Sequence, residues 1–395
     1  MIIFAFVMKK LCLFNPENDM ALASGSPYYM APASAKKMAA DLSVLPVWYE
    51  DSGCDILLAD ARQIAWLEKE CRISLPMKGV VEISQDYDEI SPWGWNPALL
   101  RRLRETGVAG SAMLSDEEML RRRMLSGRQT AVALLPRIRK EGMIGESFWM
   151  TGMDEVNEFV GRYNRVLLKA PWSGSGKGIQ WLSGGMDDNV SGWVRRILAA
   201  QGGIVGEPGY EKVLDFAMEF KASRCGFSFV GYSLFQADAR GIYKENWLAS
   251  DEAIEEHLST YVAKDVLETV RVSLLQELPS FVGGIYQGYL GVDMMVVRMG
   301  ESYAVHPCVE VNLRTNMGIV ARKFYDHYVC KGSCGRYVIE YYPKPGEALL
   351  ADEAMRKEKP LCLEGKRIRQ GYFSLTPVFE DTTYQIYVEI KVSDG

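Results

Sequence analysis

A chain of 395 residues is too long for a single hydrophobic core, so we expect two or three packed subdomains. Hydrophobic residues make up 48% of the sequence and charged residues 24%, a globular composition that excludes disordered, collagen-like and coiled-coil chains. The sequence contains 45 Lys and Arg and 51 Asp and Glu, which gives a net charge of -6. A protein without an overall positive charge is not expected to bind nucleic acid through general electrostatic attraction.

The N-terminal segment does not resemble an export signal. A short apolar run over 1–7 is interrupted by Met8-Lys9-Lys10, whereas a signal peptide carries its positive charge before a longer apolar stretch. We therefore interpret Met8 as the natural start. No stretch reaches the ~20 apolar residues of a membrane helix, so we expect a cytoplasmic protein with no membrane partner. The eight cysteines include no Cys-x-x-Cys pair, which predicts reduced thiols and no zinc knuckle.

Residues 8–110 show short apolar runs that alternate with helix-like stretches, a pattern typical of a small open α/β layer. The apolar runs cover 11–14, 45–49, 56–58 and 79–83, and the helix-like stretches cover 31–42 and 61–71. A helix over 97–105 that ends at Thr106-Gly107 predicts a domain boundary near residue 110. Two polar motifs in this region, NPEND at 15–19 and PWGWN at 92–96, match no substrate motif.

The middle of the chain predicts helices first and strands afterwards. Ser115 and Glu118 have the spacing of a capping box, so a helix should begin there, and a second should cover 130–139. Further helices are predicted over 190–200 and 252–278. The predicted strands cover 166–169, 179–182, 203–207, 216–222, 226–234, 289–297 and 303–311. After about residue 330 we expect a polar loop and then a strand pair, 371–378 and 384–392.

The segment 169–178, KAPWSGSGKG, is typical of a phosphate cradle, because glycines let backbone N–H groups approach an anion and two lysines add positive charge. It is not a Walker loop, since Gly178 and a strand follow Lys177 where Ser or Thr and a helix would be needed. The segment therefore predicts a hairpin whose tip could cover phosphates. On this segment alone, an ordinary Gly/Ser hairpin tip is an equally good interpretation.

A polar set is expected on the last two strands of the middle region. Strand alternation puts Glu310, Asn312 and Arg314 on one face of a strand, and Asp293 lies on the preceding strand. Two carboxylates and an amide oxygen suit Mg²⁺ better than zinc. The alternative is a salt-bridged rim of Glu310 and Arg314 with Asp293 at a strand edge.

A third polar point is Glu207, where an apolar strand ends in a carboxylate followed by Pro208. The chain has to leave the sheet there, and its free backbone groups could hydrogen-bond a planar base. An ordinary strand end with a solvated Glu207 is an equally good interpretation of this segment alone.

Taken together, the lysine strand, the SGSGKG flap, the Glu-Pro hinge, the Gly-Val-Asp strand and the Glu-Val-Asn-Leu-Arg strand resemble the ATP-grasp superfamily over about residues 112 to 325. The resemblance implies a mixed α/β and α+β fold in which two lobes grip ATP, preceded by the small α/β layer. The implied domains are 1–110 (pre-grasp), 111–206 (first lobe), 207–330 (second lobe) and 331–395 (a strand-rich extension packed on the second lobe).

The resemblance also implies what the site residues do. Lys169 would contact the α-phosphate and adenine, Glu207 would read the adenine amino group, and Asp215 would bind the ribose, with Glu211 as a competitor. Arg128 would stand for the basic residue of the first lobe. The flap over the β- and γ-phosphates would consist of Ser173, Gly174, Ser175, Gly176, Lys177 and Gly178.

The remaining implied residues concern the metal and the chemistry. Asp293, Glu310 and Asn312 match magnesium ligands. Arg314 would meet the transferred phosphoryl group or the acyl intermediate, and Lys177 would neutralise charge that develops on the phosphates. Many ligases of the family place an arginine two residues before the strand aspartate, whereas this sequence has Gly291.

The function implied is ATP- and Mg²⁺-dependent ligation, with Mn²⁺ as an alternative metal. A small carboxylate would be joined to an amine or thiol through an acylphosphate, and a homodimer is an open alternative to a monomer. Two rival functions remain, a phosphotransferase and a nucleotide-binding regulatory protein without ligase chemistry. Arg224, the segment 243–246 (expected as a loop), Asn316 and Tyr28-Tyr29 are further candidate substrate contacts.

Overall fold

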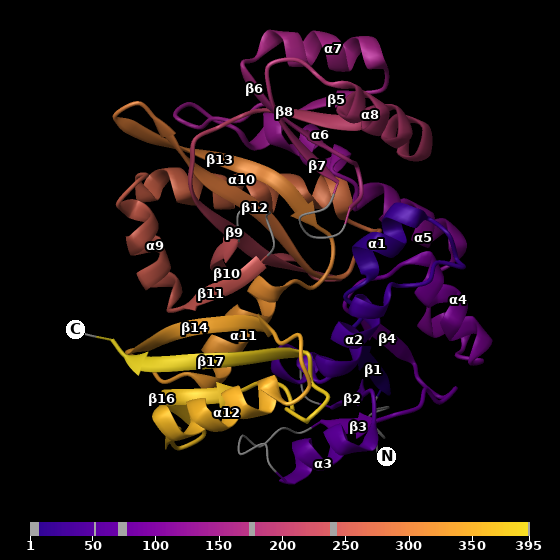
Figure 1. The fold of residues 1–395 in the computed structure, drawn as a ribbon, viewed down its shortest axis with the longest axis vertical. Helices are drawn as coiled ribbons and strands as arrows, with labels where there is room; N and C mark the ends of the chain where they lie inside the picture. Colours follow the sequence, from indigo (N-terminus) through magenta and orange to yellow (C-terminus); the bar gives the residue numbers. More distant parts are fainter. Residues whose placement is uncertain (1–7, 51–52, 70–76, 174–177, 238–242, 394–395) are drawn as a thin grey trace, which may run out of the picture. The chain divides into compact units, whose positions relative to one another are not determined.

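The computed structural model describes residues 8–50, 53–69, 77–173, 178–237 and 243–393, and its chain separates into two units (Figure 1). Unit 1 comprises Met1–Leu120, Trp247–Ala249 and Lys323–Gly395, and unit 2 comprises Arg121–Asn246 and Ser250–Arg322. The four predicted domains have other boundaries, at 110, 206 and 330, and stay a prediction. Within the described residues, none of the helices has the length and apolar character needed to cross a membrane.

The first part of unit 1 is a four-stranded parallel sheet in the order β3-β2-β1-β4, which confirms the predicted α/β layer. Its elements are β1 (Lys10–Leu13), α1 (Asn18–Ser24), α2 (Ala33–Asp41), η1 (Leu45–Trp48), β2 (Cys54–Leu57), α3 (Ala61–Lys69), β3 (Lys78–Val80), β4 (Glu89–Pro92), α4 (Pro97–Glu105) and η2 (Gly110–Ala112). The apolar run 45–49 is a short 3₁₀ helix rather than part of the sheet. Its Trp48 is buried and donates its indole N–H to the Leu375 carbonyl at 2.7 Å.

The two unassigned polar motifs lie side by side, because they follow β1 and β4, which are neighbouring parallel strands. The Asn15 Nδ2 donates to the Gly94 carbonyl at 2.8 Å, and the Asn96 Nδ2 donates to the Asn18 Oδ1 at 3.2 Å. All three asparagines are buried. Buried side-chain amides need hydrogen-bond partners. Each motif supplies such partners to the other, so the two hydrogen bonds stabilise this edge of the sheet.

The second part of unit 1 contains antiparallel strands that pair in the order β14-β17-β16-β15. Its elements are β14 (Ser333–Tyr341), α12 (Glu347–Glu358), β15 (Cys362–Glu364), β16 (Arg367–Ser374) and β17 (Tyr384–Val392). They follow α11 (Met317–Tyr328), of which the residues from Lys323 onward belong to unit 1. The final strand pair is confirmed. The expectation of a polar loop after residue 330 was wrong, because its turn-rich composition hides β14 and α12.

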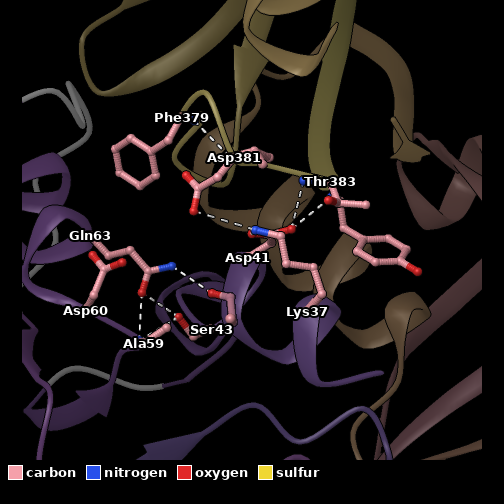
Figure 2. A network of polar contacts seen from close by, with 12 residues as sticks. Lys37, Asp41, Ser43, Ala59, Asp60, Gln63, Phe379, Asp381 and Thr383 are labelled. Carbon is pink, nitrogen blue, oxygen red and sulfur yellow. Dashed lines mark hydrogen bonds and ion pairs between the residues drawn. The ribbon is translucent and has the colours of Figure 1, made fainter. Parts of the chain in front are cut away.

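A polar network connects the two parts of unit 1, as Figure 2 shows. The carboxylate of Asp41, at the end of α2, accepts hydrogen bonds from the backbone N–H groups of Thr383 at 2.9 Å and Tyr384 at 3.0 Å. Lys37 pairs with the same carboxylate at 2.7 Å, and Arg62 pairs with Asp381 at 3.0 Å. Asp41 is buried, so it fixes the turn before β17 against α2.

Unit 2 begins at Arg121, within α5, and continues with further helices and a four-stranded antiparallel sheet in the order β5-β8-β6-β7. The elements are α5 (Asp116–Leu125), α6 (Gln129–Ile138), β5 (Phe148–Met150), α7 (Met153–Arg162), β6 (Arg165–Lys169), β7 (Ile179–Ser183), α8 (Asp188–Gln201) and β8 (Ile204–Pro208). The capping box is confirmed, since the Glu118 N–H donates to the Ser115 Oγ at 3.2 Å and the Ser115 N–H to the Glu118 Oε2 at 2.8 Å. The strand–flap–strand hairpin is confirmed by the β6–β7 pairing.

The core of this sheet lies between its strands and the helices α7 and α8. Val156 and Phe159 from α7 and Val194 from α8 pack against Leu168 of β6 and Ile204 of β8. These apolar contacts hold β6 and β8 in place, the strands that carry Lys169 and Glu207.

Unit 2 also contains antiparallel strands that pair in the order β13-β12-β9-β10-β11. Its elements are β9 (Lys212–Ser223), β10 (Gly226–Ala237), β11 (Tyr243–Leu248), α9 (Asp251–Ser259), α10 (Lys264–Val282), β12 (Gly288–Met299) and β13 (Ser302–Asn312). Two expectations were wrong. The segment 243–246 is strand rather than loop, and the helix predicted over 252–278 is two helices. Ser250 caps α9, and the chain turns at residues 260–263 before α10 begins.

Candidate functional site

Three neighbouring strands of unit 2 present a polar face. In antiparallel pairs, directly opposite residues lie on the same side, and so do residues two apart along a strand. The registers of β9, β12 and β13 therefore put three cross-strand rows on one face: Asp215, Met295 and His306; Ala217, Asp293 and Glu310; Glu219, Gly291 and Asn312. A register shift between β12 and β13 separates the first two rows. Four carboxylates thus share this face.

The predicted metal ligands are brought together. Asp293 and Glu310 lie opposite each other, and the Asn312 Nδ2 donates to the Asp293 Oδ2 at 2.9 Å, which leaves the amide oxygen of Asn312 for another partner. Burial, and after it the neighbouring Glu310 carboxylate, raises the pKa of Asp293 to about 7. Two adjacent carboxylates and an amide oxygen are a hard donor set that fits Mg²⁺, and a divalent cation would relieve their repulsion.

Histidine and cysteine ligands contribute nothing to this donor set. Among the described residues, three or more His, Cys, Asp or Glu side chains nowhere gather in an arrangement that could hold a metal ion. The predicted set contains two such residues and relies on the Asn312 amide for its third ligand. The ligand assignment therefore stays a prediction.

Arg128 joins Glu310, one of the predicted metal ligands, to the glycine segment. Its guanidinium pairs with Glu310 at 3.2 Å, and its Nη1 donates to the Ala170 carbonyl at 2.6 Å and to the Ser173 Oγ at 2.9 Å. Arg128 is buried, so it is a fixed positive charge between the two. Residues 174–177 lie outside the described residues. Gly178 adopts φ of 71°, and its carbonyl accepts the Ala170 N–H at 2.8 Å, which closes the base of the hairpin.

Lys169 and Glu207 form a buried ion pair between neighbouring strands. Their Nζ and Oε2 atoms are 2.6 Å apart, and each side chain is only 4% exposed. The Ser147 hydroxyl is a second, longer contact of Glu207, at 3.5 Å. Buried charges of this kind need a close partner. The sequence predicted both residues for the nucleotide, but not that each would neutralise the other.

The two candidate ribose acids differ in position. Asp215 lies on the polar face, pairs with Lys212 at 2.5 Å, and has its pKa raised by burial. Glu211 precedes β9, and its exposed carboxylate pairs with Arg298 at 3.0 Å. Asp215 is therefore the candidate that lies with the other predicted site residues.

Arg314 follows the end of β13, in the loop before α11, and donates to the Thr315 carbonyl at 3.1 Å. Its charge acts on both Asp293 and Glu219, lowering the pKa of each against the effect of burial. Arg314 thus lies within electrostatic reach of Asp293. The expectation that it would share a strand face with Glu310 and Asn312 was wrong, because β13 ends at Asn312.

Two functional candidates were missed at the level of sequence. Glu219 and His306 lie on the polar face, are 1% and 0% exposed, and follow no motif. Burial raises the pKa of Glu219 to about 8, against a hydrogen bond from Asn316 that favours the ionised form. Strand alternation from Asp215 would have placed Glu219 on this face, and alternation alone could have found it.

The absence of an arginine at Gly291 has a steric reason. A Cβ at position 291 would come within 2.5 Å of the Glu219 Oε2 and closer still to the Asn316 Nδ2. We expect Gly291→Ala to lower the free energy of unfolding by about 1–3 kcal/mol, because buried overpacking is destabilising. Urea unfolding checks this. Gly192→Ala in α8, where a Cβ would meet only Arg196 at 3.6 Å, is the matched control and should not destabilise. Equal stability of both variants would contradict the steric explanation for Gly291.

His306 predicts a pH dependence of stability. Neither ring nitrogen meets a hydrogen-bond partner in the described part of the chain, and the ring packs edge-on to Tyr210. Burial, with repulsion from Lys169 and Arg139, lowers the pKa of His306 to about 3. In the unfolded chain this histidine has a pKa of about 6.5, so it binds a proton at a pH where the folded histidine does not. The free energy of unfolding therefore decreases as the pH falls below about 6.5.

His306→Phe removes the contribution of this histidine to the pH dependence of stability. Between pH 7 and pH 5 the wild type is expected to lose about 2 kcal/mol of unfolding free energy relative to the variant. The raised pKa values of Asp293 and Glu219 act in the opposite sense in both proteins and cancel in the difference. Urea titrations at the two pH values measure it. Parallel pH profiles of the two proteins would show that His306 titrates normally.

The other candidate substrate contacts lie in different parts of the structure. Asn316 and Asn246 are buried and bonded to Glu219 and Ser233, so they belong to the interior of unit 2. Arg224 is exposed at the turn between β9 and β10, and Tyr28 lies in unit 1, where Arg101 stacks on its ring. The structure thus gathers Asn316 with the polar face and leaves Arg224 apart from it. The seven described cysteines are free thiols, and Cys71 lies outside the described residues.

Comparison with known proteins gives matches only at the level of structure. No protein-family model and no curated protein matches the sequence. The N5-carboxyaminoimidazole synthetase of Staphylococcus aureus complexed with ADP is 10% identical with a TM-score of 0.51, covering 98% of this chain and 95% of its own. The corresponding ribonucleotide synthetase of Thermus thermophilus is 12% identical with a TM-score of 0.51, covering 98% and 94%.

A biotin carboxylase of Campylobacter jejuni is 12% identical with a TM-score of 0.50, covering 98% of this chain and 88% of its own. At such identities the likeness concerns the fold alone, but it extends over nearly the whole chain. These neighbours are ATP-grasp enzymes. The chain therefore has the ATP-grasp fold, which confirms what the order of its motifs predicted.

Proposed function

We propose that this protein is an ATP- and Mg²⁺-dependent ligase that joins a small carboxylate to an amine. The observation that carries the proposal is the polar face of β9, β12 and β13, where Asp293, Glu310 and Asn312 form an oxygen donor set inside an ATP-grasp fold. The similar structures from S. aureus and C. jejuni contain ADP and a β,γ-ATP ligand, which supports ATP as the nucleotide.

The predicted site residues have separate roles in binding the nucleotide and the metal. Lys169, together with Glu207, would bind the α-phosphate and the adenine, and Asp215 would accept the ribose hydroxyls. Asp293, Glu310 and Asn312 would hold Mg²⁺, which neutralises charge on the β- and γ-phosphates when bound. Arg128 would supply fixed positive charge at the base of the flap, because its guanidinium already contacts Ser173 and Glu310.

The proposed reaction has two steps. A carboxylate oxygen of the substrate attacks the γ-phosphorus and ADP leaves, which produces an acylphosphate. The amine nitrogen then attacks the carbonyl carbon, and phosphate leaves as the amide forms. Arg314 would meet the negative charge that develops on the transferred phosphoryl group. Exclusion of water is needed between the steps, since water would hydrolyse the acylphosphate.

The test is ADP release by the purified protein with pools of small carboxylic acids and amino acids. We expect release to require Mg²⁺ or Mn²⁺ and one carboxylic acid, and an amine to yield one amide per ADP. A stable phosphorylated product without any amine would show a phosphotransferase instead. Nucleotide binding that is indifferent to Mg²⁺ and accompanied by no turnover would show a regulatory protein.

A further inference from the structure

We propose that Glu219 is a positioning residue that holds the loop carrying Arg314 against the polar face. The inference rests on the proposed function, because Arg314 is the residue assigned there to the transferred phosphoryl group. It concerns a side chain that lies outside every motif and that none of the steps above uses.

The contacts form a short chain from strand to loop. The Glu219 Oε2 accepts a hydrogen bond from the Asn316 Nδ2 at 2.8 Å, and the Asn316 Oδ1 accepts the Ile319 N–H at 2.9 Å. Asn316 thus caps the first turn of α11 with one end of its amide and meets Glu219 with the other. Because the loop from Leu313 to Asn316 is only four residues long, fixing Asn316 restricts where Arg314 can lie.

The surroundings are shaped to admit this carboxylate. A Cβ at Gly318 would come within 2.5 Å of the Ser233 Oγ and closer still to the Glu219 Oε1. Gly291 leaves room in the same way for the other carboxylate oxygen, Glu219 Oε2. Two glycines from separate elements therefore leave room for one buried acid, which a residue serving only as filler would not require.

Substitutions at position 219 separate this contact from packing. Leucine would fill a similar volume but would remove the acceptor for Asn316, whereas glutamine would keep both the shape and the acceptor. Glu219→Leu therefore breaks the connection between strand and loop, and Glu219→Gln is the conservative variant that should retain it.

The experiment is a double-mutant cycle read by calorimetric binding of MgADP and of a magnesium complex of a non-hydrolysable ATP analogue. Glu219→Leu should weaken the ATP analogue about tenfold relative to MgADP, because only the analogue carries a γ-phosphoryl group for Arg314, and Glu219→Gln should keep the wild-type ratio of affinities. In an Arg314→Ala background, Glu219→Leu should add no further loss. Ser233→Ala, in the same buried pocket but without a bond to Asn316, is the matched control and should leave the ratio of affinities unchanged.

Asn316→Ser provides an independent variant, because serine keeps the cap of α11 but lacks the amide donor to Glu219. It should reproduce the selective loss for the ATP analogue. Equal weakening of both nucleotides, or additive losses with Arg314→Ala, would overturn the positioning assignment and leave the proposed function intact. If the wild type bound neither nucleotide, the proposed function itself would fail.

Discussion

Glu310→Gln is expected to lower Mg²⁺-dependent ADP release by roughly 10³-fold while the protein remains folded. The substitution removes one of two carboxylates that face each other across β12 and β13, and a bound metal contributes several kcal/mol to such reactions. Steady-state ADP release at saturating Mg²⁺ is the measurement, and calorimetric titration of MgADP should show weakened binding.

The fold should survive because Arg128 keeps other partners. Its guanidinium still donates to the Ala170 carbonyl and the Ser173 hydroxyl when the carboxylate is replaced by an amide. Glu301→Gln is the matched control, an exposed acid in the turn of the same hairpin that should have normal activity. Undiminished turnover in Glu310→Gln would remove the metal assignment.

Lys169→Met is expected to lower the free energy of unfolding by about 3–5 kcal/mol and to abolish measurable nucleotide binding. The loss is large because Glu207 would remain as a buried carboxylate whose nearest other hydrogen bond is the 3.5 Å contact with Ser147. Urea unfolding and calorimetric titration of MgADP measure the two effects separately.

The double variant Lys169→Met/Glu207→Leu distinguishes the two contributions. Replacing both members of a buried ion pair removes the unpaired charge, so most of the lost stability should return. Nucleotide binding should remain absent, because both proposed contacts are gone. A double variant as unstable as Lys169→Met alone would show that the ion pair is not what makes the single substitution costly.

Local patterns along the chain were sufficient for much of the site. The glycine segment between two strands predicted the β6–β7 hairpin, and alternation along β13 predicted that Glu310 and Asn312 share a face. The same alternation wrongly extended the strand to Arg314, because β13 ends at Asn312. Both inferences need only backbone geometry within a few residues. Turn composition misled where it masked regular structure, as at β14 and α12, and a helical pattern over 252–278 did not reveal the break before α10.

The sequence by itself determined which residue types the site contains and in what order the strands present them, because alternation and turn chemistry act over short distances. Only the tertiary structure decided the partners: Arg128 with Glu310, Lys169 with Glu207, and Glu219 with Asn316. Each of these pairs joins segments that are far apart along the chain and adjacent only after the strands have paired. Their burial, which makes the charges interact strongly, likewise arises only from packing of the whole unit.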